Sequence, residues 1–533
     1  MSRLPEWPPS ISHPELEHLT NLATTYALSH GLLYLPPHPP SGAPPPTQAP
    51  SSAIHAPFSI FPSPFPRTLF EKAQRLQRAY NSDGAEVGAG RVDEFTGELW
   101  KIWKSLRDEG IEQELQLGIF RSDYLLHASD ESQPMLLKQV EFNTISSSFG
   151  ALSERVSALH NYLYASTGYF NSSPYLKPEN FPPNRTTAAV VEGLVAAHYA
   201  YGVKDARILF VVQAGERNVF DQRWLDYELL EKHGIHIIRQ TLPELASSAH
   251  LSPTRSLLIS DSPQSPPNAT EISTIYFRAA YTPTDFPTPE HFSTRALLER
   301  SRATKCPSIQ LQLAGGKMVQ MALTKAGVLE RFLNGDGDAQ ADGMFAFGEE
   351  EVREVRESWM GMWRLGDNPP AGSATPSGME RAAMNHANLV LKPQREGGGN
   401  NVYKSSILPF LETLPERERE AWIAMELIEP PVSVGGWLVR AGSTGSSATG
   451  PTGGGGAVKS DIVSELGIFG WALFGPGQVG GAAQTKDVAK NSETMMRTGE
   501  GGWLVRTKGR ESDEGGVAVG FSVLDSVVLI DPN

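Results

Sequence analysis

The strongest chemical signal in the chain is the stretch LKPQREGGGNN, residues 391–401. Lys392 and Glu396 stand beside three consecutive glycines, and two asparagines follow. A glycine-rich turn exposes backbone N–H groups that can surround phosphate oxygens, and a lysine can place a positive charge on them. A carboxylate beside an anion site is unfavourable unless a cation lies between them, so Glu396 indicates Mg²⁺. The pattern favours a nucleotide site, with a charged turn and glycine hinge as the alternative.

A second pattern, QVEFNTISSSFG, covers residues 139–150. Glu141 and Asn143 lie two positions apart, so on a strand their side chains share one face. Both offer the oxygen atoms that Mg²⁺ prefers. Ser146–Ser148 then supply hydroxyl and N–H groups suited to a carboxylate or a peptide. Taken alone, the pattern is better explained as a strand with a polar face and a serine-rich turn.

Two further segments carry charged residues at informative positions. Arg506 and Lys508 also share a strand face, and the charged stretch that follows ends in Gly515–Gly516. This indicates a flap that would exclude water from a reactive intermediate, although a solvated hairpin loop fits as well. Residues 216–222 follow a predicted strand, where open parallel sheets bind ligands. A helix-capping turn is the equally plausible interpretation there.

The bulk composition excludes several classes of protein. The 533-residue chain has a net charge of −14, which argues against a large nucleic-acid-binding surface. Cys306 is the single cysteine, so no intramolecular disulfide framework can form. The glycines before Lys459 do not make a P-loop, because Val458 precedes the lysine. No segment has the run of apolar residues needed to cross a membrane, and we expect a cytoplasmic protein.

The elements that must position these residues suggest a mixed α/β chain. A capping box at Ser12 predicts a helix over 12–31, and the proline-rich residues 34–66 predict an extended loop. Helical periodicity covers 67–114 and returns after residue 150. From residue 205, a strand, a helix and a second strand follow in β-α-β order, which predicts a parallel-sheet unit over 205–317. Residues 441–460 read as a flexible insertion.

Several strings between residues 121 and 525 occur together in the order typical of one family. They are RSDYLL, VEFNTISSSFGALSERVSALH, ERNVFDQR, KCPSIQLQLAGGK, LKPQREGGGNNVY, SELGIFG, and RTK with GGVAVGFSVLD. In these strings the chain resembles eukaryotic-type glutathione synthetase, a member of the ATP-grasp superfamily. The resemblance implies an α/β ATP-grasp fold with an inserted smaller parallel α/β substrate-binding domain. The expected domains are 1–204, 205–317 and 318–533, the last with the insertion 441–460 and a flap at 509–516.

The resemblance also implies an activity. The family joins γ-glutamylcysteine to glycine with ATP and Mg²⁺, through an acyl phosphate that the glycine amine attacks, and it forms homodimers. Such an enzyme works by positioning and charge stabilisation, so it needs no nucleophile of its own. Two alternatives stay open: an acceptor such as β-alanine in place of glycine, and an inactive binding paralogue.

Individual roles follow from the matched motif positions. The resemblance implies Mg²⁺ ligands at Glu141, Asn143 and Glu396, and catalytic arginines at Arg121 and Arg506. It implies ATP contacts at Glu141, Lys317, Lys392, Gly397, Gly398, Gly399, Asn401, Tyr403, Met425, Ile428, Glu465, Lys508 and Glu514. It implies peptide-substrate contacts at Arg121, Ile145, Ser146, Ser147, Ser148, Glu216, Arg217, Asn218, Gln222, Arg278, Tyr281, Arg506, Val517 and Ala518.

One motif departs from the family. Where the family has Arg-Asp-Gly-Tyr, this chain has Arg278-Ala279-Ala280-Tyr281. The arginine and tyrosine are kept, but the acid and the flexible glycine are lost. If the missing acid made a side-chain contact, substrate affinity should fall; if the contacts there come from the backbone, little should change.

Overall fold

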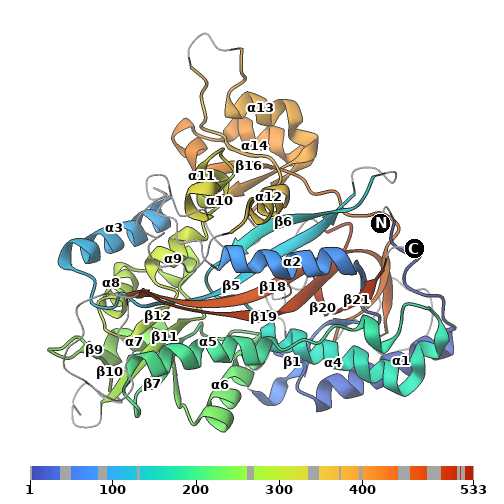
Figure 1. Ribbon diagram of the computed structural model, residues 1–533, viewed down its shortest axis with the longest axis horizontal. Coiled ribbons are helices and arrows are strands. Elements are labelled where there is room, and N and C mark those ends of the chain that lie inside the picture. The colour runs from blue at the N-terminus through green and yellow to red at the C-terminus, as the bar shows by residue number, and fades with distance from the viewer. Residues whose placement is uncertain are drawn as a thin grey trace, which may run out of the picture.

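Figure 1 shows the computed structural model of the chain. The structure describes residues 3–36, 50–81, 93–128, 133–260, 269–333, 347–370, 374–394, 400–441, 456–476, 494–512, 517 and 522–531. Within these residues, no helix is both long and apolar enough to cross a membrane.

A seven-stranded sheet forms the centre of the molecule (Figure 1). Its order is β17 (Gly435–Val439), β3 (Phe58–Ser59), β20 (Ser522–Asp525), β19 (Thr494–Gly509), β18 (Val458–Pro476), β5 (Gln116–His127) and β6 (Leu136–Asn143). All its neighbours pair antiparallel except β20 with β3. Helix α2 (Arg67–Tyr80) packs on one face, and α4 (Gly150–Thr167) and α5 (Thr186–Tyr201) pack on the other.

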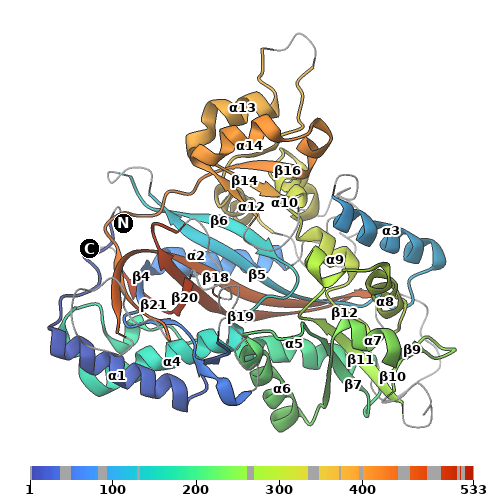
Figure 2. The same cartoon turned by 180° about the vertical axis from the view of Figure 1, so that it is seen from behind.

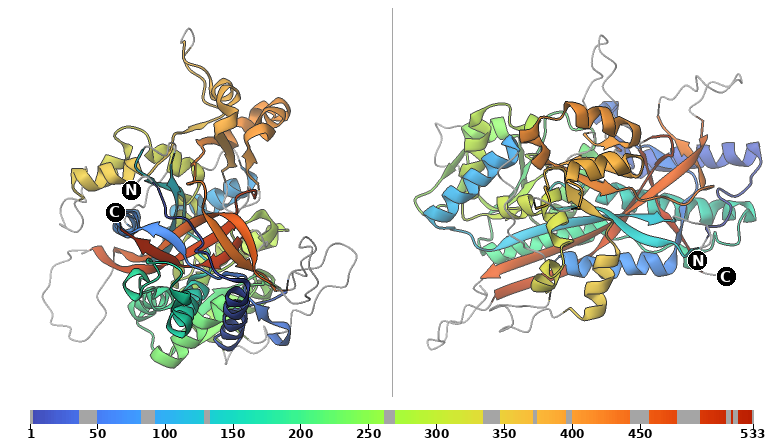
Figure 3. Two further views of the ribbon diagram at one scale, coloured as in Figure 1. Left: turned by 90° about the vertical axis from the view of Figure 1, so that its right-hand side faces the viewer. Right: turned by 90° about the horizontal axis from the view of Figure 1, so that it is seen from above.

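A smaller antiparallel sheet stands above the central one, on the side of α2 (Figures 1 and 3). Its order is β13 (Met362–Arg364), β16 (Trp422–Glu426), β14 (Leu389–Pro393) and β15 (Val402–Tyr403). Around it lie α10 (Lys317–Leu323), α11 (Val328–Leu333), α12 (Glu349–Glu357), α13 (Gly378–Asn385) and α14 (Ile407–Thr413). Two sheets that face each other across charged residues are the arrangement expected of the ATP-grasp fold.

A third sheet lies on the opposite side and is mixed (Figure 2). Its parallel strands are β8 (Ile237–Gln240), β7 (Arg207–Val211), β11 (Thr270–Phe277) and β12 (Thr304–Cys306). The helices α6 (Val219–His233), α7 (Leu242–Ser248), α8 (Pro289–Glu299) and α9 (Ile309–Ala314) belong to the same segment, and α3 (Glu94–Glu109) packs against α8 and α9. The parallel unit predicted over 205–317 is therefore present. Two antiparallel strands that the sequence did not indicate, β10 (Leu257–Ile259) and β9 (Ala249–Leu251), extend it.

The N-terminal segment departs from its prediction in part. The capping box is formed: α1 (His13–Ser29) begins where Ser12 and Glu15 cap it reciprocally. The expected extended loop at 34–66 instead contains short strands, namely the end of β1 (Leu33–Tyr34), β2 (Ile54–His55), β3 and β4 (Ser63–Pro66). β4 pairs in parallel with β21 (Val527–Ile530). The sequence does not indicate β3 and β4 because their partners lie far away in the chain, whereas β1 and β2, which pair with each other, are only two residues long. Of the insertion 441–460, residues 442–455 lie outside the described residues and 458–460 begin β18.

Candidate functional site

A row of polar and charged side chains crosses four strands of the central sheet. Arg121 on β5 is opposite Asn143 on β6, and Asp123 is opposite Glu141. On the other side of β5, Asp123 is opposite Gly467 of β18. Because alternate residues of a strand share a face, this pairing gathers side chains from β5 and β6 at one place.

Asp123 is the centre of this row. Its side chain is fully buried. It accepts two hydrogen bonds from Arg121, at 2.6 and 2.8 Å, and one from Asn143 at 3.0 Å. It also accepts one from Arg506 of β19 at 2.9 Å. A buried carboxylate is tolerated only with such compensation, and here it fixes both predicted catalytic arginines.

Asp123 was not among the residues predicted from the sequence. The string RSDYLL contains the signal, because Asp123 lies two residues after Arg121 and both side chains would share one face of a strand. The neighbouring Gly467 leaves room for the cluster: a Cβ atom there would lie 2.8 Å from Oδ1 of Asp123 and 2.9 Å from Cδ of Arg121. A larger residue at 467 would therefore displace the ion pair.

Glu465 completes the row on β18. It lies opposite Arg506 and accepts a hydrogen bond from its guanidinium. Burial raises the pKa of Glu465 even against the attraction of Arg506. For Arg506, the neighbouring carboxylates outweigh burial and raise its pKa above the ordinary value, so this arginine is permanently charged.

Two lysines approach Glu141 from the side of the small sheet. Lys317 at the start of α10 forms an ion pair with Glu141 at 3.1 Å. Lys392 on β14 donates to the carbonyl oxygen of Val140 at 3.1 Å. Burial opposes the charge of Glu141, but the two lysines outweigh it and lower the pKa of this carboxyl. Burial, followed by repulsion from Lys317, lowers the pKa of Lys392 to about 8.

The two lysines are held together by Gln394. Its Oε1 accepts a hydrogen bond from the backbone N–H of Met318 at 2.6 Å, one residue after Lys317. The side chain is buried, and it packs where Gly316 has no Cβ. This link joins the end of β14 to the start of α10. Two positive side chains thus converge on one carboxylate, an arrangement suited to phosphate oxygens.

The remaining residues predicted for ATP lie along the same side. Met425 is buried on β16 between Met362 and Val390 in the strand pairing, and Ile428 follows this strand half-buried. Asn401 donates to the hydroxyl of Tyr403 at 3.2 Å beside β15. Lys508 lies two residues beyond Arg506 on β19. The predicted Glu396, Gly397, Gly398, Gly399, Glu514 and Ala518 lie outside the described residues, whereas Val517 is buried.

The serine-rich turn after β6 is tied to two arginines. Arg278 donates to the carbonyl oxygen of Ser147 at 2.9 Å and to Oγ of Ser148 at 2.7 Å. Arg121 donates to the carbonyl oxygen of Ser148 at 3.1 Å. Ile145 and Ser147 are buried. The predicted substrate residues from β5, the turn and the end of β11 are therefore brought together.

Asp221 holds the far end of this turn, and the sequence analysis missed it. Its carboxylate accepts hydrogen bonds from the backbone N–H groups of Phe149, Ala151 and Leu152, at 2.7 to 3.1 Å. It therefore caps α4 from another helix, α6. Ser146 and Phe149 have positive φ, at 56° and 69°, a conformation that needs such support. Since the capped groups lie about 70 positions away, no local pattern could identify this role.

The polar residues at the start of α6 form a separate hydrogen-bonded network. Gln222 donates to Glu216 and accepts from Arg239 at 2.5 Å. Burial raises the pKa of Glu216, although the charge of Arg278 opposes this. Asn218 is buried nearby. Arg217 differs from the other predicted residues, because its guanidinium lies over the ring of Tyr34 and donates to the carbonyl oxygen of Leu35.

The altered motif after Arg278 is accommodated by apolar packing. Ala279 and Ala280 are buried in a cluster that includes Ile145. Ala280 has a φ of 71°, which explains why glycine suits this position. Its carbonyl oxygen accepts from Gln312 at 2.8 Å, and the N–H of Tyr281 donates to Asp285 at 3.1 Å. The backbone contacts of the turn are thus present without the acid.

The donor set beside Asp123 suits a divalent cation. The amide nitrogen of Asn143 donates to Asp123 and to the carbonyl oxygen of Arg121, which leaves the amide oxygen to face a ligand. Glu141 shares its strand face. Among the described residues, no group of three or more His, Cys, Asp or Glu side chains is arranged to hold a metal. Two oxygen ligands with substrate phosphates are, however, the usual environment of Mg²⁺.

Comparison with known proteins agrees with this geometry. Residues 13–529 match the family model described as eukaryotic glutathione synthase, ATP binding domain. The chain is 34% identical to glutathione synthetase of Bos taurus, over 96% of both chains. It is 34% identical to the chloroplastic glutathione synthetase of Solanum lycopersicum, over 90% of this chain and 78% of the relative. A solved glutathione synthetase-like effector from Globodera pallida, in its apo form, has the same fold, with a TM-score of 0.66 at 22% identity over 98% of each chain.

Proposed function

The chain belongs to the eukaryotic glutathione synthase family, and on that premise we propose how its own residues perform the family's reaction. It is an ATP-dependent ligase that makes glutathione from γ-glutamylcysteine and glycine. The observation that carries the proposal is the Asp123 cluster, which joins Arg121 and Arg506 beside the lysines at Glu141.

We assign the phosphate end of the reaction to the lysines. Lys317 and Lys392 converge on Glu141 from α10 and β14, and both side chains are buried. The triphosphate of ATP would offer several oxygens to Lys317, which pairs with Glu141, and to Lys392, which donates to the carbonyl oxygen of Val140, and it would restore the full charge of Lys392. Met425 and Ile428 would pack against the adenine from β16. Tyr403, Asn401, Glu465 and Lys508 would contact the nucleotide around it.

We assign the peptide end to the turn and its arginines. The cysteinyl carboxylate of γ-glutamylcysteine attacks the γ-phosphorus, ADP leaves, and an acyl phosphate forms. The glycine amine then attacks the acyl carbon, and phosphate leaves with the former carboxylate oxygen. Arg121 and Arg506 would stabilise the charge that develops on the transferred group, because Asp123 already holds them in place. Ser146–Ser148, Arg278, Glu216, Asn218 and Gln222 would hold the γ-glutamyl part.

Mg²⁺ is part of the proposal through Glu141, Asn143 and Glu396. The side chains of Glu141 and Asn143 fit it as neighbouring oxygen donors on β6. When bound, the ion would neutralise charge on the transferred phosphate. Glu396 lies outside the described residues, and its part rests on the matched motif alone.

The assembly and location of the enzyme are also proposals. We propose a homodimer, as implied by the family. We propose a cytoplasmic location from the sequence, although relatives include chloroplastic enzymes of Solanum lycopersicum and Arabidopsis thaliana.

The experiment is a steady-state assay of ADP release by the purified full-length chain, with Mg-ATP and γ-glutamylcysteine. We expect turnover with glycine and a roughly 10- to 100-fold lower kcat/KM with β-alanine, since one extra methylene in a small pocket is worth ~1–3 kcal/mol. ADP release that ignores γ-glutamylcysteine would contradict the ligase mechanism. The variant Lys392→Met should lose ATP binding measured by calorimetry, and unchanged binding would move the phosphate site elsewhere.

A further inference from the structure

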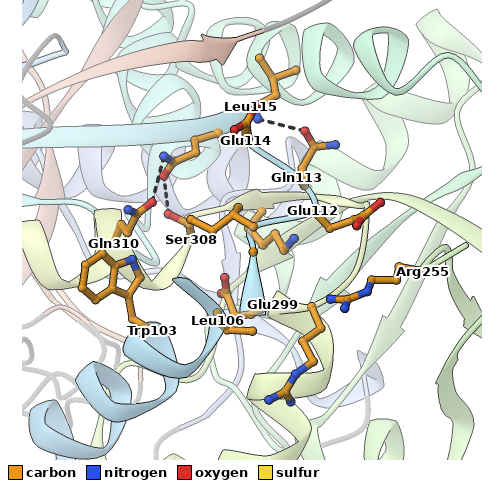
Figure 4. A pocket seen from close by; sticks show the side chains of 15 residues that line it. Trp103, Leu106, Glu112, Gln113, Glu114, Leu115, Arg255, Glu299, Ser308 and Gln310 are labelled. Carbon is orange, nitrogen blue, oxygen red and sulfur yellow. Dashed lines mark hydrogen bonds between the residues drawn. The ribbon is translucent and has the colours of Figure 1, made fainter. Parts of the chain in front are cut away.

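A separate cavity of about 250 Å³ lies between α3, the start of β5, α8 and β12 (Figure 4). Its lining includes Trp103 and Leu106 from α3, Gln116 from β5, and Lys305 and Ser308 at the end of β12. None of the residues proposed above to bind ATP, Mg²⁺ or the peptide lines it. The cavity is therefore separate from the proposed catalytic site.

Lys305 is the most unusual residue of this lining. Its side chain is buried, with 4% of its surface exposed. Its ammonium donates to the backbone oxygen of Ser301 at 2.5 Å, and within the described part of the chain no carboxylate lies in ion-pair range. Lysine is almost never fully buried without a partner. Burial lowers its pKa to about 8, so it is still mostly protonated near neutral pH.

Trp103 supplies an unsatisfied donor. Only 5% of its surface is exposed, and its indole nitrogen has no hydrogen-bond partner among the described residues. A buried N–H without an acceptor costs about 1–3 kcal/mol. The cavity lining therefore contains a buried indole N–H that lacks an acceptor and a buried ammonium that donates to a backbone carbonyl and forms no ion pair among the described residues, and a carboxylate could accept from both.

The other charges around the cavity divide into paired and unpaired groups. Glu299 is bound by Arg295 at 2.8 Å, and Arg300 is bound by Glu109 at 2.8 Å. Within each of these two ion pairs the opposite charges cancel. Arg255, Glu112 and Glu114 line the cavity without an ion pair in the described structure. The mixture of positive and negative groups is unsuited to a phosphate dianion and suited to a zwitterion.

Apolar side chains occupy the remaining wall. Leu106, Ile111, Leu115 and the ring of Trp103 line the cavity together. Figure 4 shows Trp103 and Gln310 on one side and Glu112 and Arg255 on the other. A bound molecule could thus meet buried donors, an acidic group and an apolar surface at once. The volume suits a single amino acid better than a nucleotide.

We propose that this cavity binds a small α-amino acid with an apolar side chain. Its carboxylate accepts hydrogen bonds from the ammonium of Lys305 and the indole N–H of Trp103. Its ammonium faces Glu112 and Glu114, and its side chain lies against Leu106 and Leu115. The inference concerns a site apart from the catalytic one, so its failure would leave the ligase assignment unchanged.

The cavity is linked to catalytic elements through its polar wall. Ser308 donates to Gln116 at 2.5 Å, and Gln116 donates to Gln310 at 3.1 Å. Gln116 begins β5, the strand that carries Arg121 and Asp123, and Ser308 caps α9 through the N–H of Leu311. A ligand here would therefore contact the start of a strand that reaches the active site. The proposal itself is limited to binding.

The test is isothermal titration calorimetry on the full-length chain with L-leucine as the probe. We expect saturable binding, with none for 3-methylbutylamine, which lacks only the carboxylate. Lys305→Met and Trp103→Phe should each weaken L-leucine binding about tenfold, the effect of one hydrogen bond to a charged group. The matched control is Lys101→Met, an exposed lysine of α3 outside the cavity, which should bind normally.

The outcomes are decisive either way. Thermal denaturation would verify that each variant is folded. If Lys305→Met does not fold, Trp103→Phe still tests the site, because phenylalanine keeps an aromatic ring and removes only the indole N–H donor. Excess γ-glutamylcysteine should leave L-leucine binding intact, because the sites are separate. Absence of saturable binding, equal binding of the amine, or unchanged binding in both variants would each overturn the proposal.

Discussion

The two ends of the proposed active site are held by different kinds of structure. At the phosphate and arginine end, Arg121, Asp123 and Arg506 lie on paired antiparallel strands, and strand pairing sets their positions. At the peptide end, Ser146–Ser148 lie on a turn with positive φ that other elements must support. The strand-borne end is rigid through charge and pairing, whereas the turn depends on the distant partners Asp221 and Arg278.

The largest expected effect is at the strand-borne end. Asp123→Asn removes the negative charge between the buried Arg121 and the half-buried Arg506. We expect kcat/KM to fall on the order of 10²- to 10³-fold, the usual effect of losing one group that stabilises the charge of the transition state. Steady-state ADP release measures this, with exposed Asp108→Asn as the control. A loss below threefold would show that the cluster is not what positions the arginines.

The turn should respond differently to the loss of Asp221. Asp221→Ala leaves the N–H groups of Phe149, Ala151 and Leu152 without their acceptor, so we expect the free energy of unfolding to drop by about 2–4 kcal/mol. The KM for γ-glutamylcysteine should rise about tenfold, with a smaller change for ATP. Urea unfolding and initial rates check the two effects. Equal rises for both substrates would mean that the helix cap supports the whole site, not the turn; exposed Asp205→Ala should change neither.

The phosphate end should also show a pH signature. Lys392 has a pKa lowered to about 8, so in the free enzyme it is charged below that pH and neutral above it. We expect kcat/KM for ATP to fall about tenfold per pH unit above this value, since the neutral form lacks the phosphate-binding charge. Lys392→Arg should remove this descending limb, because arginine stays protonated. An identical limb in that variant would assign it to another group.

The smallest expected effect concerns the altered turn. Ala280 adopts a φ of 71°, and Ala280→Gly should relieve strain and stabilise the fold by about 0.5–1 kcal/mol in a denaturant titration. Ala279→Gly is the matched control, because Ala279 does not have positive φ, and it should destabilise. Stabilisation by both would attribute the effect to flexibility rather than to backbone strain.

The contrast between positions set by the strand period and positions set by distant partners explains which residues could be predicted from the sequence. Glu141 with Asn143 and Arg506 with Lys508 were predictable because the period of a strand places alternate residues on one face. Arg121 with Asp123 follows the same rule, although Asp123 was not predicted. Asp221, Gln394 and the short strands β3 and β4 depend on partners far away in the chain, which local patterns do not encode. The parallel order of β7, β8 and β11 was readable, whereas the antiparallel β9 and β10 were not.

The central claim is that this site transfers the γ-phosphate of ATP to the carboxylate of γ-glutamylcysteine before glycine reacts. Positional isotope exchange tests it directly, with ATP that carries ¹⁸O in the bridge between its β- and γ-phosphorus atoms. Without glycine, the wild-type enzyme should move the label from the bridge to the non-bridging β-oxygens only when γ-glutamylcysteine is present, and Asp123→Asn should slow this strongly. No exchange under conditions where adding glycine gives full turnover, or exchange that needs no γ-glutamylcysteine, would contradict the account.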